Sequence, residues 1–435
     1  MKYDYNSKDP NKIKREDMSD SQQFLIYESK SFCILPWIHI HSFPNGPAYP
    51  CCNTEMKDVI GNTNEQSLEE IWNGAPLKEV RRKMLNNEEV SGCTRCYEQD
   101  DMGFFSMRVS SNKHFGHHIV RTDETLEDGT LPNMKIAYWD VRFSNLCNLR
   151  CRSCGHIFSS NWYDDQIKLL TEENGGTPLV SWPKNNKRIH FAGRTEDDMW
   201  NQLEQQIDNL EQVYFAGGEP LIMEEHYRLL KELLARGKTN VRLIYNTNFT
   251  ELVYKKTNVL ELWKEFDSVS IGASLDAMGP RAEYIRKNTD WDQVEKNREQ
   301  MLKICPKVDF YISPTLSIMN AWHVSDFHKD WVEKGLLKHQ DLNINVLQEP
   351  IHYRIDIAPL AFKEEIKEKW EEHINWLKPH DHLNRAITGF EGAINLMMAD
   401  DKTNLLSKFW EKTKTLDKIR NENILESIPE LRALL

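Results

Sequence analysis

Three cysteines stand in one short loop, Cys147-Asn-Leu-Arg-Cys151-Arg-Ser-Cys154, directly after a strand-like run at 135–143. Three thiolates this close together can hold three irons of a [4Fe–4S] cluster and leave the fourth iron open for chemistry. Structural zinc usually takes four ligands in paired short spacings, and it stays an alternative because His156 could supply a fourth. A disulfide would need an oxidising compartment, for which the N-terminus gives no signal. The loop therefore favours an iron–sulfur cluster.

A second motif follows about sixty residues later, where a strand-like run at 213–216 ends in Gly217-Gly218-Glu219-Pro220. By itself this run would be an ordinary strand-to-helix turn. A loop cysteine triplet followed by a strand with this ending resembles the radical S-adenosylmethionine (SAM) enzymes, over roughly residues 134–346. The resemblance implies that the open iron chelates the methionine end of SAM and that reductive cleavage gives a 5′-deoxyadenosyl radical. It also implies that Glu219 lies near the SAM amino group.

Polar residues follow the next two strand-like runs, and in parallel α/β folds reactive groups gather beyond such strand ends. The resemblance implies that these residues bind the SAM ribose and carboxylate: Asn246 and Asn248 after the third run, Ser274 and Asp276 after the fourth. Arg286 resembles an arginine that pairs with the SAM carboxylate in related peptide-modifying members, where a guanidinium offers a bidentate fork. Each residue could instead be an ordinary cap or surface charge.

One position departs from the family pattern. The residue before the third cysteine is usually aromatic and lies against the adenine, but in this chain it is Ser153. Phe158, or a residue of the fifth strand, could supply that contact instead. Cluster binding does not depend on this position.

A second group of cysteines precedes the triplet and consists of Cys33, Cys51, Cys52, Cys93 and Cys96. With Gly46 and a helical segment at 67–73, the group resembles the SPASM and twitch modules that hold auxiliary clusters, and the shorter twitch type fits better. The resemblance implies a second [4Fe–4S] cluster on Cys33, Cys51, Cys93 and Cys96, with Cys52 as a substitute for Cys51. A structural zinc ribbon is the alternative, because a Cys-x2-Cys pair and a distant pair also suit zinc. Nearby His39 and His41 lie in a strand-like run, where histidines are more often structural.

Strand-like and helical runs alternate through the middle of the chain, which predicts a parallel sheet with crossover helices. Candidate strands lie at 135–143, 213–216, 241–246, 268–274, 308–315 and 342–346; candidate helices lie at 224–236, 253–265, 291–303 and 324–334. Six units suit the partial (β/α)6 parallel barrel that the resemblance implies. We expect a polar, partly disordered lead (1–30), a small cysteine-rich auxiliary-cluster domain with a helix at 68–85 (31–110), a linker (111–133), the barrel (134–350) and a helical C-terminal tail (351–435).

Composition bounds the function classes. The chain has 435 residues, a formal net charge of −12 and 40% hydrophobic residues, enough for two or three domains with a large core. The negative charge argues against nonspecific binding to nucleic acid or an anionic membrane. No apolar segment approaches the ~20 residues needed to cross a bilayer, and the polar N-terminus lacks a secretory core, so we expect a cytoplasmic protein. Cys305, which stands alone, is expected to be a small buried hydrophobe.

These expectations combine into a two-cluster radical SAM enzyme that receives electrons from a reducing partner such as flavodoxin or ferredoxin. An auxiliary cluster that takes an electron from a substrate radical implies an oxidative outcome, and this module type favours a peptide or protein substrate. A sugar or nucleotide is the alternative within the enzyme class. Outside that class, the chain would be an iron–sulfur or zinc protein that acts through binding partners.

Overall fold

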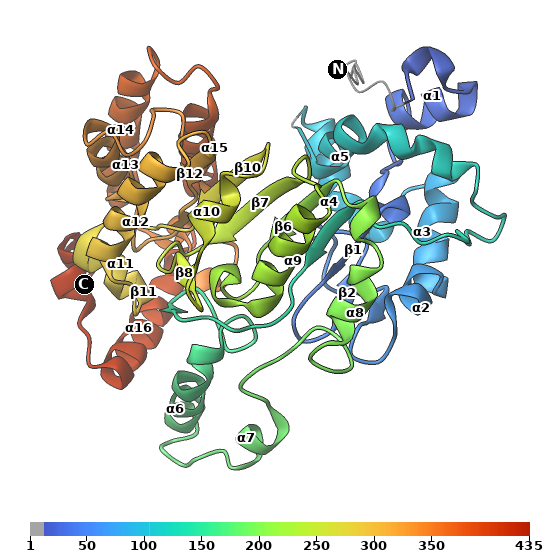
Figure 1. Cartoon of the computed structure of the whole chain (residues 1–435). Helices are drawn as coiled ribbons and strands as arrows, with labels where there is room; N and C mark the ends of the chain where they lie inside the picture. Colours follow the sequence, from blue (N-terminus) through green and yellow to red (C-terminus); the bar gives the residue numbers. More distant parts are fainter. Residues whose placement is uncertain (1–12, 104) are drawn as a thin grey trace. The chain divides into compact units, whose positions relative to one another are not determined.

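The computed structural model describes residues 13–103 and 105–435, so the first twelve residues of the predicted lead lie outside the described residues. The chain divides into two compact units, which are described separately (Figure 1). The first unit contains the described residues up to Ser144 together with Phe191–Tyr214. The second unit contains Asn145–His190 and Phe215–Leu435.

A sheet in the order β6-β4-β1-β2-β3 organises the first unit. Its strands are β1 (His39–Ser42), β2 (Pro47–Tyr49), β3 (Gly61–Asn62), β4 (Tyr138–Val141) and β6 (Gln212–Phe215). β4 runs parallel to β6 and to β1, whereas β1, β2 and β3 pair antiparallel. A strand of the cysteine-rich segment thus extends the parallel sheet that the first two predicted barrel strands begin.

The first unit also contains helices: α1 (Asp20–Tyr27), α2 (Leu68–Trp72), α3 (Ala75–Leu85), α4 (Thr94–Asp101), α5 (Met107–Phe115), α8 (Asp198–Glu204) and the 3-10 helix η4 (Gly116–Thr122). The single helix predicted at 68–85 is wrong, because Gly74 separates α2 from α3 and Pro76 has no N–H to continue a helix. Residues 111–133, predicted as a linker, hold the end of α5 and η4. Ile119 and Leu131 are fully buried there.

In the second unit, β7 (Arg242–Thr247), β10 (Val269–Ala273) and β12 (Asp309–Ile312) are parallel, and β13 (Thr315–Leu316) pairs with β14 (Asn345–Val346). Between them lie α9 (Glu224–Ala235), α10 (Val259–Trp263), α11 (Gly279–Ile285), α12 (Trp291–Ile304) and α13 (Val324–Glu333). The predicted mixed α/β fold with parallel barrel strands and a helical C-terminal region is confirmed. The helix predicted at 253–265 is wrong in its first half. There β8 (Val253–Tyr254) and β9 (Thr257–Asn258) form a hairpin, because Lys255 and Lys256 adopt positive φ in the turn.

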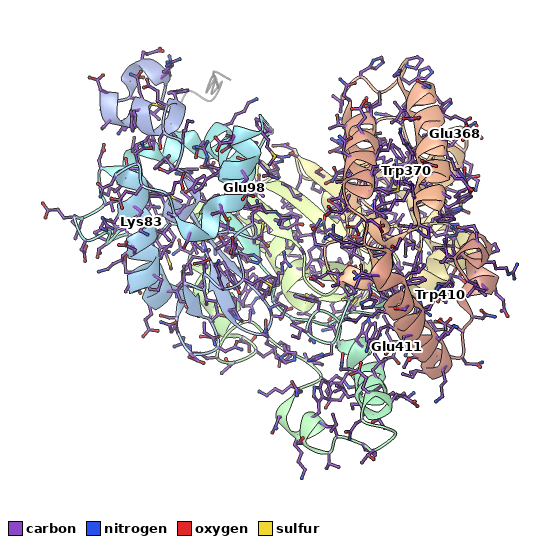
Figure 2. The ribbon with its side chains drawn as sticks, turned by 180° about the vertical axis from the view of Figure 1, so that it is seen from behind. Lys83, Glu98, Glu368, Trp370, Trp410 and Glu411 are labelled. Carbon is purple, nitrogen blue, oxygen red and sulfur yellow. The ribbon has the colours of Figure 1, made fainter. Side chains whose placement is uncertain are left out.

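The C-terminal tail consists of α14 (Leu360–Leu377), α15 (Arg385–Ala399), α16 (Leu406–Arg420) and α17 (Ile424–Ser427). Figure 2 shows Trp370 between the helices and Glu368 pointing outward. Trp370 is fully buried, and its ring centroid lies 5.7 Å from that of Phe390 on α15. Two further helices of the second unit, α6 (Tyr163–Glu173) and α7 (Ser181–Asn185), precede β6 in the sequence. Within the described part of the chain, none of the helices is long and apolar enough to cross a membrane.

Candidate metal centres

The loop that carries Cys147, Cys151 and Cys154 is held by hydrogen bonds to its own backbone. The Trp162 indole N–H donates to the Cys151 carbonyl at 2.7 Å, and the Cys154 N–H donates to the same carbonyl at 3.1 Å. The Ser159 hydroxyl donates to the Leu149 carbonyl at 2.6 Å. The three thiols lie near one another, because a charge on Cys151 adds to burial in raising the pKa of both Cys147 and Cys154.

Gly217 and Gly218 allow the end of β6 to lie against this cysteine loop. Gly217 has a φ of +116°, which favours glycine, and a Cβ on Gly218 would meet the Leu146 carbonyl oxygen at 2.1 Å. The Glu219 N–H donates to that same carbonyl at 2.8 Å. Pro220 then starts a short 3-10 helix, Pro220–Ile222. The Gly-Gly-Glu-Pro run thus packs on the residue that precedes Cys147.

Glu219 is buried and ties this run to the end of β7. Its Oε1 accepts from the Thr247 hydroxyl at 2.7 Å and from the Leu221 N–H at 3.0 Å, and its Oε2 accepts from the Asn248 N–H at 2.7 Å. Burial raises the pKa of Glu219 to about 7, although these three hydrogen bonds act to lower it. The carboxyl group therefore lies in an environment where a nearby cation would favour its charged form.

Asn248 is also part of a side-chain network with the cysteine loop. Its Nδ2 donates to Asn148 Oδ1 at 2.8 Å, and Asn148 Nδ2 donates to the Thr250 hydroxyl at 2.8 Å. Asn148 lies between the first two cysteines and was not among the predicted site residues. Asn246 lies within β7, and the Ser274 N–H donates to the Thr247 carbonyl at 2.7 Å, so both are at the same strand ends.

Arg286 and Asp276, predicted separately, form a bidentate ion pair. Arg286 Nε and Nη2 donate to the two Asp276 oxygens at 2.8 and 3.0 Å. Two short strands, β5 (Arg150–Cys151) and β11 (Arg286–Lys287), pair antiparallel and place Arg286 opposite Cys151. Arg286 Nη1 accordingly lies 3.5 Å from Cys151 Sγ. The guanidinium thus already neutralises one carboxylate while it faces a sulfur of the cysteine loop.

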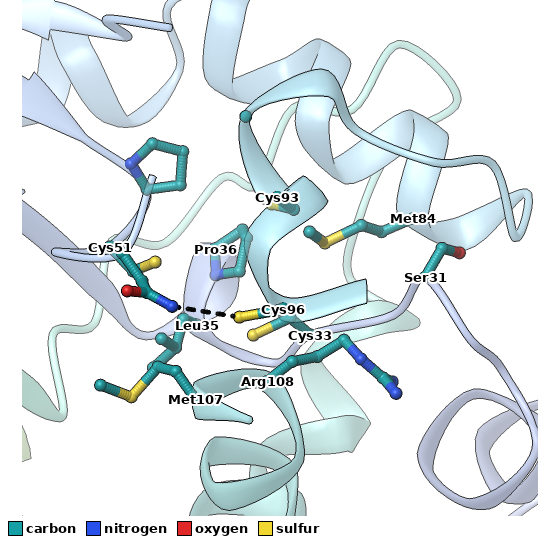
Figure 3. A pocket seen from close by; sticks show the side chains of 13 residues that line it. Ser31, Cys33, Leu35, Pro36, Cys51, Met84, Cys93, Cys96, Met107 and Arg108 are labelled. Atoms are coloured by element: carbon teal, nitrogen blue, oxygen red, sulfur yellow. Dashed lines mark hydrogen bonds between the residues drawn. The ribbon is translucent and has the colours of Figure 1, made fainter. Parts of the chain in front are cut away.

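The second cysteine set surrounds one cavity in the first unit (Figure 3). Cys33, Cys51, Cys93 and Cys96 line it, together with Met84, Met107 and Arg108. The Asn53 amide donates to Cys96 Sγ at 3.5 Å, and Asp100 holds the Arg108 guanidinium at 2.7 Å. Gly46 lies in the turn between β1 and β2. Cys52 does not line the cavity.

Cys52 instead lies beside two charged side chains. Asp140 on β4 and Arg142 both act electrostatically on its thiol, and burial raises the Cys52 pKa well above its usual range. His41 Nδ1 lies 3.0 Å from Asp140 Oδ2, and both side chains are almost completely buried. Burial opposes the charge on Asp140, but His41 and Arg142 outweigh it and lower the Asp140 pKa to about 2. Of the neighbouring residues Cys51 and Cys52, only Cys51 therefore lines the cavity with the other three cysteines.

The donor set of both cysteine groups fits a bound cluster. Burial raises the pKa of every predicted thiol for which a shift is resolved, to about 12 for Cys93 and for Cys154. Buried thiols of this kind are poor nucleophiles, and they become thiolates when a cation binds among them. No three cysteine sulfurs of the described chain lie within 4.8 Å of one another. Tetrahedral zinc would hold its sulfurs about 3.8 Å apart, whereas a [4Fe–4S] cluster places each thiolate on a separate iron and needs a wider arrangement.

Sequence reasoning missed one support of the cysteine loop. Arg152 lies between Cys151 and Cys154, is almost fully buried, and has its guanidinium 3.7 Å from the centre of the Tyr284 ring. It forms ion pairs with Asp417 on α16 and, at 2.7 Å, with Glu422. These acids are about 270 residues further along the chain, so no local sequence signal points to them. Ser153, which follows Arg152, has no aromatic ring that could stack on an adenine.

Two protein-family models match the chain. The model of the radical SAM superfamily matches residues 141–319, and the model of the SPASM domain, an iron–sulfur cluster-binding domain, matches residues 33–97. The SPASM match precedes the radical SAM match and covers the four cysteines that line the cavity. The expected family resemblance is thereby confirmed, as is the N-terminal position of the auxiliary module. No curated protein sequence matches the chain.

Solved structures show weaker likeness. Native anSMEcpe with bound AdoMet shares 19% sequence identity at a TM-score of 0.36, and the match covers 54% of this chain and 60% of that one. Streptococcus suis SuiB bound to S-adenosylmethionine shares 12% identity at a TM-score of 0.32, with 69% and 63% covered. SuiB bound to the precursor peptide SuiA shares 14% identity at a TM-score of 0.33, with 69% and 64% covered. The chain thus spans about 60% of the length of these proteins.

Proposed function

Because this chain belongs to the radical SAM superfamily and carries a SPASM domain ahead of its radical SAM domain, we propose that it is an enzyme that oxidatively modifies a peptide or protein. When bound and reduced, a three-cysteine [4Fe–4S] cluster supplies electrons that cleave SAM to a 5′-deoxyadenosyl radical. Cys147, Cys151 and Cys154 would hold that cluster. The observation that carries this assignment is the packing of Gly218 and Glu219 on the loop carbonyl of Leu146.

The residues around the loop would orient SAM. Glu219 would face the amino group, and because burial raises its pKa to about 7 despite the charge of Arg286, a bound ammonium group would favour its charged form. Arg286 would turn its remaining N–H groups to the SAM carboxylate, with Asp276 fixing the plane of the guanidinium. Asn246, Asn248 and Ser274, at the ends of the same strands, would meet the ribose.

Four cysteines around the second cavity would leave no open iron on the auxiliary cluster. Such a cluster carries electrons and does not bind substrate, and Arg108 beside it would favour the reduced form by adding positive charge. An electron acceptor next to a radical enzyme supports an oxidative outcome: a dehydrogenation, or a new C–C, C–S or C–O bond. A peptide substrate is supported by the SPASM type of the module, and flavodoxin or ferredoxin would supply the electrons.

The direct test uses the anaerobically reconstituted chain with SAM, dithionite and a library of short synthetic peptides. We expect 5′-deoxyadenosine from the enzyme alone and, with the right peptide, a product that has lost two hydrogen atoms by mass spectrometry. Absence of 5′-deoxyadenosine from a preparation with full iron content would reject the radical activity. Turnover of a sugar or nucleotide, but of no peptide, would reject the substrate class alone.

Glu219→Gln and Arg286→Ala are each expected to weaken SAM binding. Loss of a charge-assisted hydrogen bond costs about 1.5–3 kcal/mol, which is about 10- to 150-fold in Kd. The Glu219 pKa of about 7 adds a pH dependence. Between pH 8 and pH 6 the carboxylate gains a proton and loses its attraction for the SAM ammonium, so wild-type affinity falls toward low pH. Equilibrium binding by calorimetry measures both effects.

In Glu219→Gln the position carries no charge at either pH, so its weaker binding should vary less between pH 8 and pH 6. A matched control is Glu283→Gln on α11, three residues before Arg286 in the sequence and outside the predicted SAM contacts. It should bind SAM as the wild type does. Unchanged affinity in both site variants would reject this orientation of SAM.

A further inference from the structure

A third group of potential metal ligands lies in the first unit, apart from both cysteine sets. His117 Nε2 lies 3.0 and 2.9 Å from the two oxygens of Glu211, and His118 Nε2 lies 3.0 Å from Oε1 of the same carboxylate. All three ligand atoms are within 4.8 Å of one another. Among the described residues, this is the one group of three or more histidine, cysteine or acidic side chains with that property.

The fold holds these side chains in place before any ligand arrives. Both histidines lie in η4, which follows α5 directly, and their ring centroids are 4.2 Å apart. Glu211 immediately precedes β6, and its N–H donates to the Ala137 carbonyl at 2.9 Å. Both imidazoles direct Nε2 at the Glu211 carboxylate. The three side chains are preorganised, because η4 fixes the two histidines and the backbone hydrogen bond before β6 fixes Glu211.

Burial and charge suit a cation bound at one open side. The side chains of His117, His118 and Glu211 are 7%, 21% and 32% exposed, so the group is sheltered but reachable by water. Burial opposes the charge on Glu211, but hydrogen bonds from both histidines hold the pKa of its carboxyl far below the usual range. The group therefore offers one carboxylate oxygen and two imidazole nitrogens within 4.8 Å of one another.

We propose that His117, His118 and Glu211 bind a divalent cation of the zinc class. Two imidazoles and one carboxylate are a common zinc donor set, completed by water in the fourth position. Magnesium and calcium prefer oxygen ligands throughout, so the two nitrogens select against them. The competing explanation is a carboxylate that accepts two imidazole N–H bonds with no metal.

The position of the group indicates a structural role for the ion. Glu211 stands before the first residue of β6, whereas Gly217 and Gly218 follow its last residue. The ion would therefore bind just before the first residue of this strand, whereas the two glycines follow its last residue. It would join η4 to the start of β6. The site is independent of the proposed radical chemistry, and it would add one zinc to a chain in which the two proposed cysteine sets would hold iron.

The test uses the full-length chain, reconstituted with iron and sulfide, stripped of loosely bound metal by a mild chelator and titrated with zinc. We expect one zinc per wild-type chain by elemental analysis and a higher Tm in its presence. His118→Ala and Glu211→Gln should lose that zinc with unchanged iron. Their affinity should fall by more than the about 10- to 100-fold that the loss of an outer-shell partner costs. His114→Ala, an exposed histidine three residues before His117, is the matched control and should keep the zinc.

Cobalt gives a second readout that distinguishes this group from the cysteines. A nitrogen and oxygen site shows only weak visible bands with Co²⁺, whereas cysteine ligation adds intense sulfur-to-cobalt bands in the near ultraviolet. Weak bands that disappear in His118→Ala support the site, and that variant keeps the test usable if Glu211→Gln fails to fold. No zinc bound by the wild type, zinc retained by both variants, or intense sulfur bands would overturn the proposal.

Discussion

Replacement of Cys147, Cys151 and Cys154 together by alanine is expected to remove about half of the iron and all reductive cleavage of SAM. This replacement should leave the cavity lined by Cys33, Cys51, Cys93 and Cys96 unchanged, because the two cysteine sets belong to different compact units. About four irons per chain should therefore remain of about eight. Anaerobic reconstitution, iron analysis and chromatography of 5′-deoxyadenosine after addition of dithionite measure both quantities.

Cys305→Ala is the matched control for this variant. Cys305 is a buried cysteine of the same unit, it follows α12, and it belongs to neither set. Its replacement should leave the iron content and SAM cleavage unchanged. That result would show that the loss of a buried thiol does not by itself reduce either quantity. Formation of 5′-deoxyadenosine by the triple variant would contradict the assignment of the catalytic cluster.

Replacement of Cys51 is expected to damage the auxiliary cluster, whereas replacement of its neighbour Cys52 is not. Cys51 lines the cavity with Cys33, Cys93 and Cys96, but Cys52 lies beside Asp140 and Arg142. The combined Cys51→Ala and Cys93→Ala variant should lose about four of about eight irons. It should still cleave SAM in the absence of substrate, because that step needs only the three-cysteine cluster. Mössbauer spectroscopy distinguishes loss of one cluster from partial loss of both.

Cys52→Ala serves as the control, with full iron content expected. Zinc must be counted in the His118→Ala background, so that an ion on His117, His118 and Glu211 is not mistaken for one on the cysteines. About four irons and one zinc per chain in that background would show a zinc ribbon and remove the support for an oxidative reaction. Equal loss of iron in Cys51→Ala and Cys52→Ala would contradict the orientation of these side chains.

The sequence by itself was sufficient for the features that depend on short spacings. The cysteine loop and the Gly-Gly-Glu-Pro run lie within a few residues, so residue types alone indicate their chemistry. Alternation of strand and helix predicted the parallel α/β fold, because period-2 and period-3.6 patterns record which side of each element is buried. The helix interruptions at Gly74 and at Lys255 are also determined by nearby residues. They depend on backbone φ and ψ angles, which residue propensities predict poorly.

Tertiary structure alone decided contacts between distant segments. Cys51 and Cys52 are equivalent in spacing, and only the packing of β1 against β4 puts Asp140 beside one of them. Arg152 reaches Asp417, and His117 reaches Glu211, across sequence separations of 265 and 94 residues. Long-range partners of this kind leave no periodic trace in the chain, because register and crossover connections, and not local propensity, bring them together.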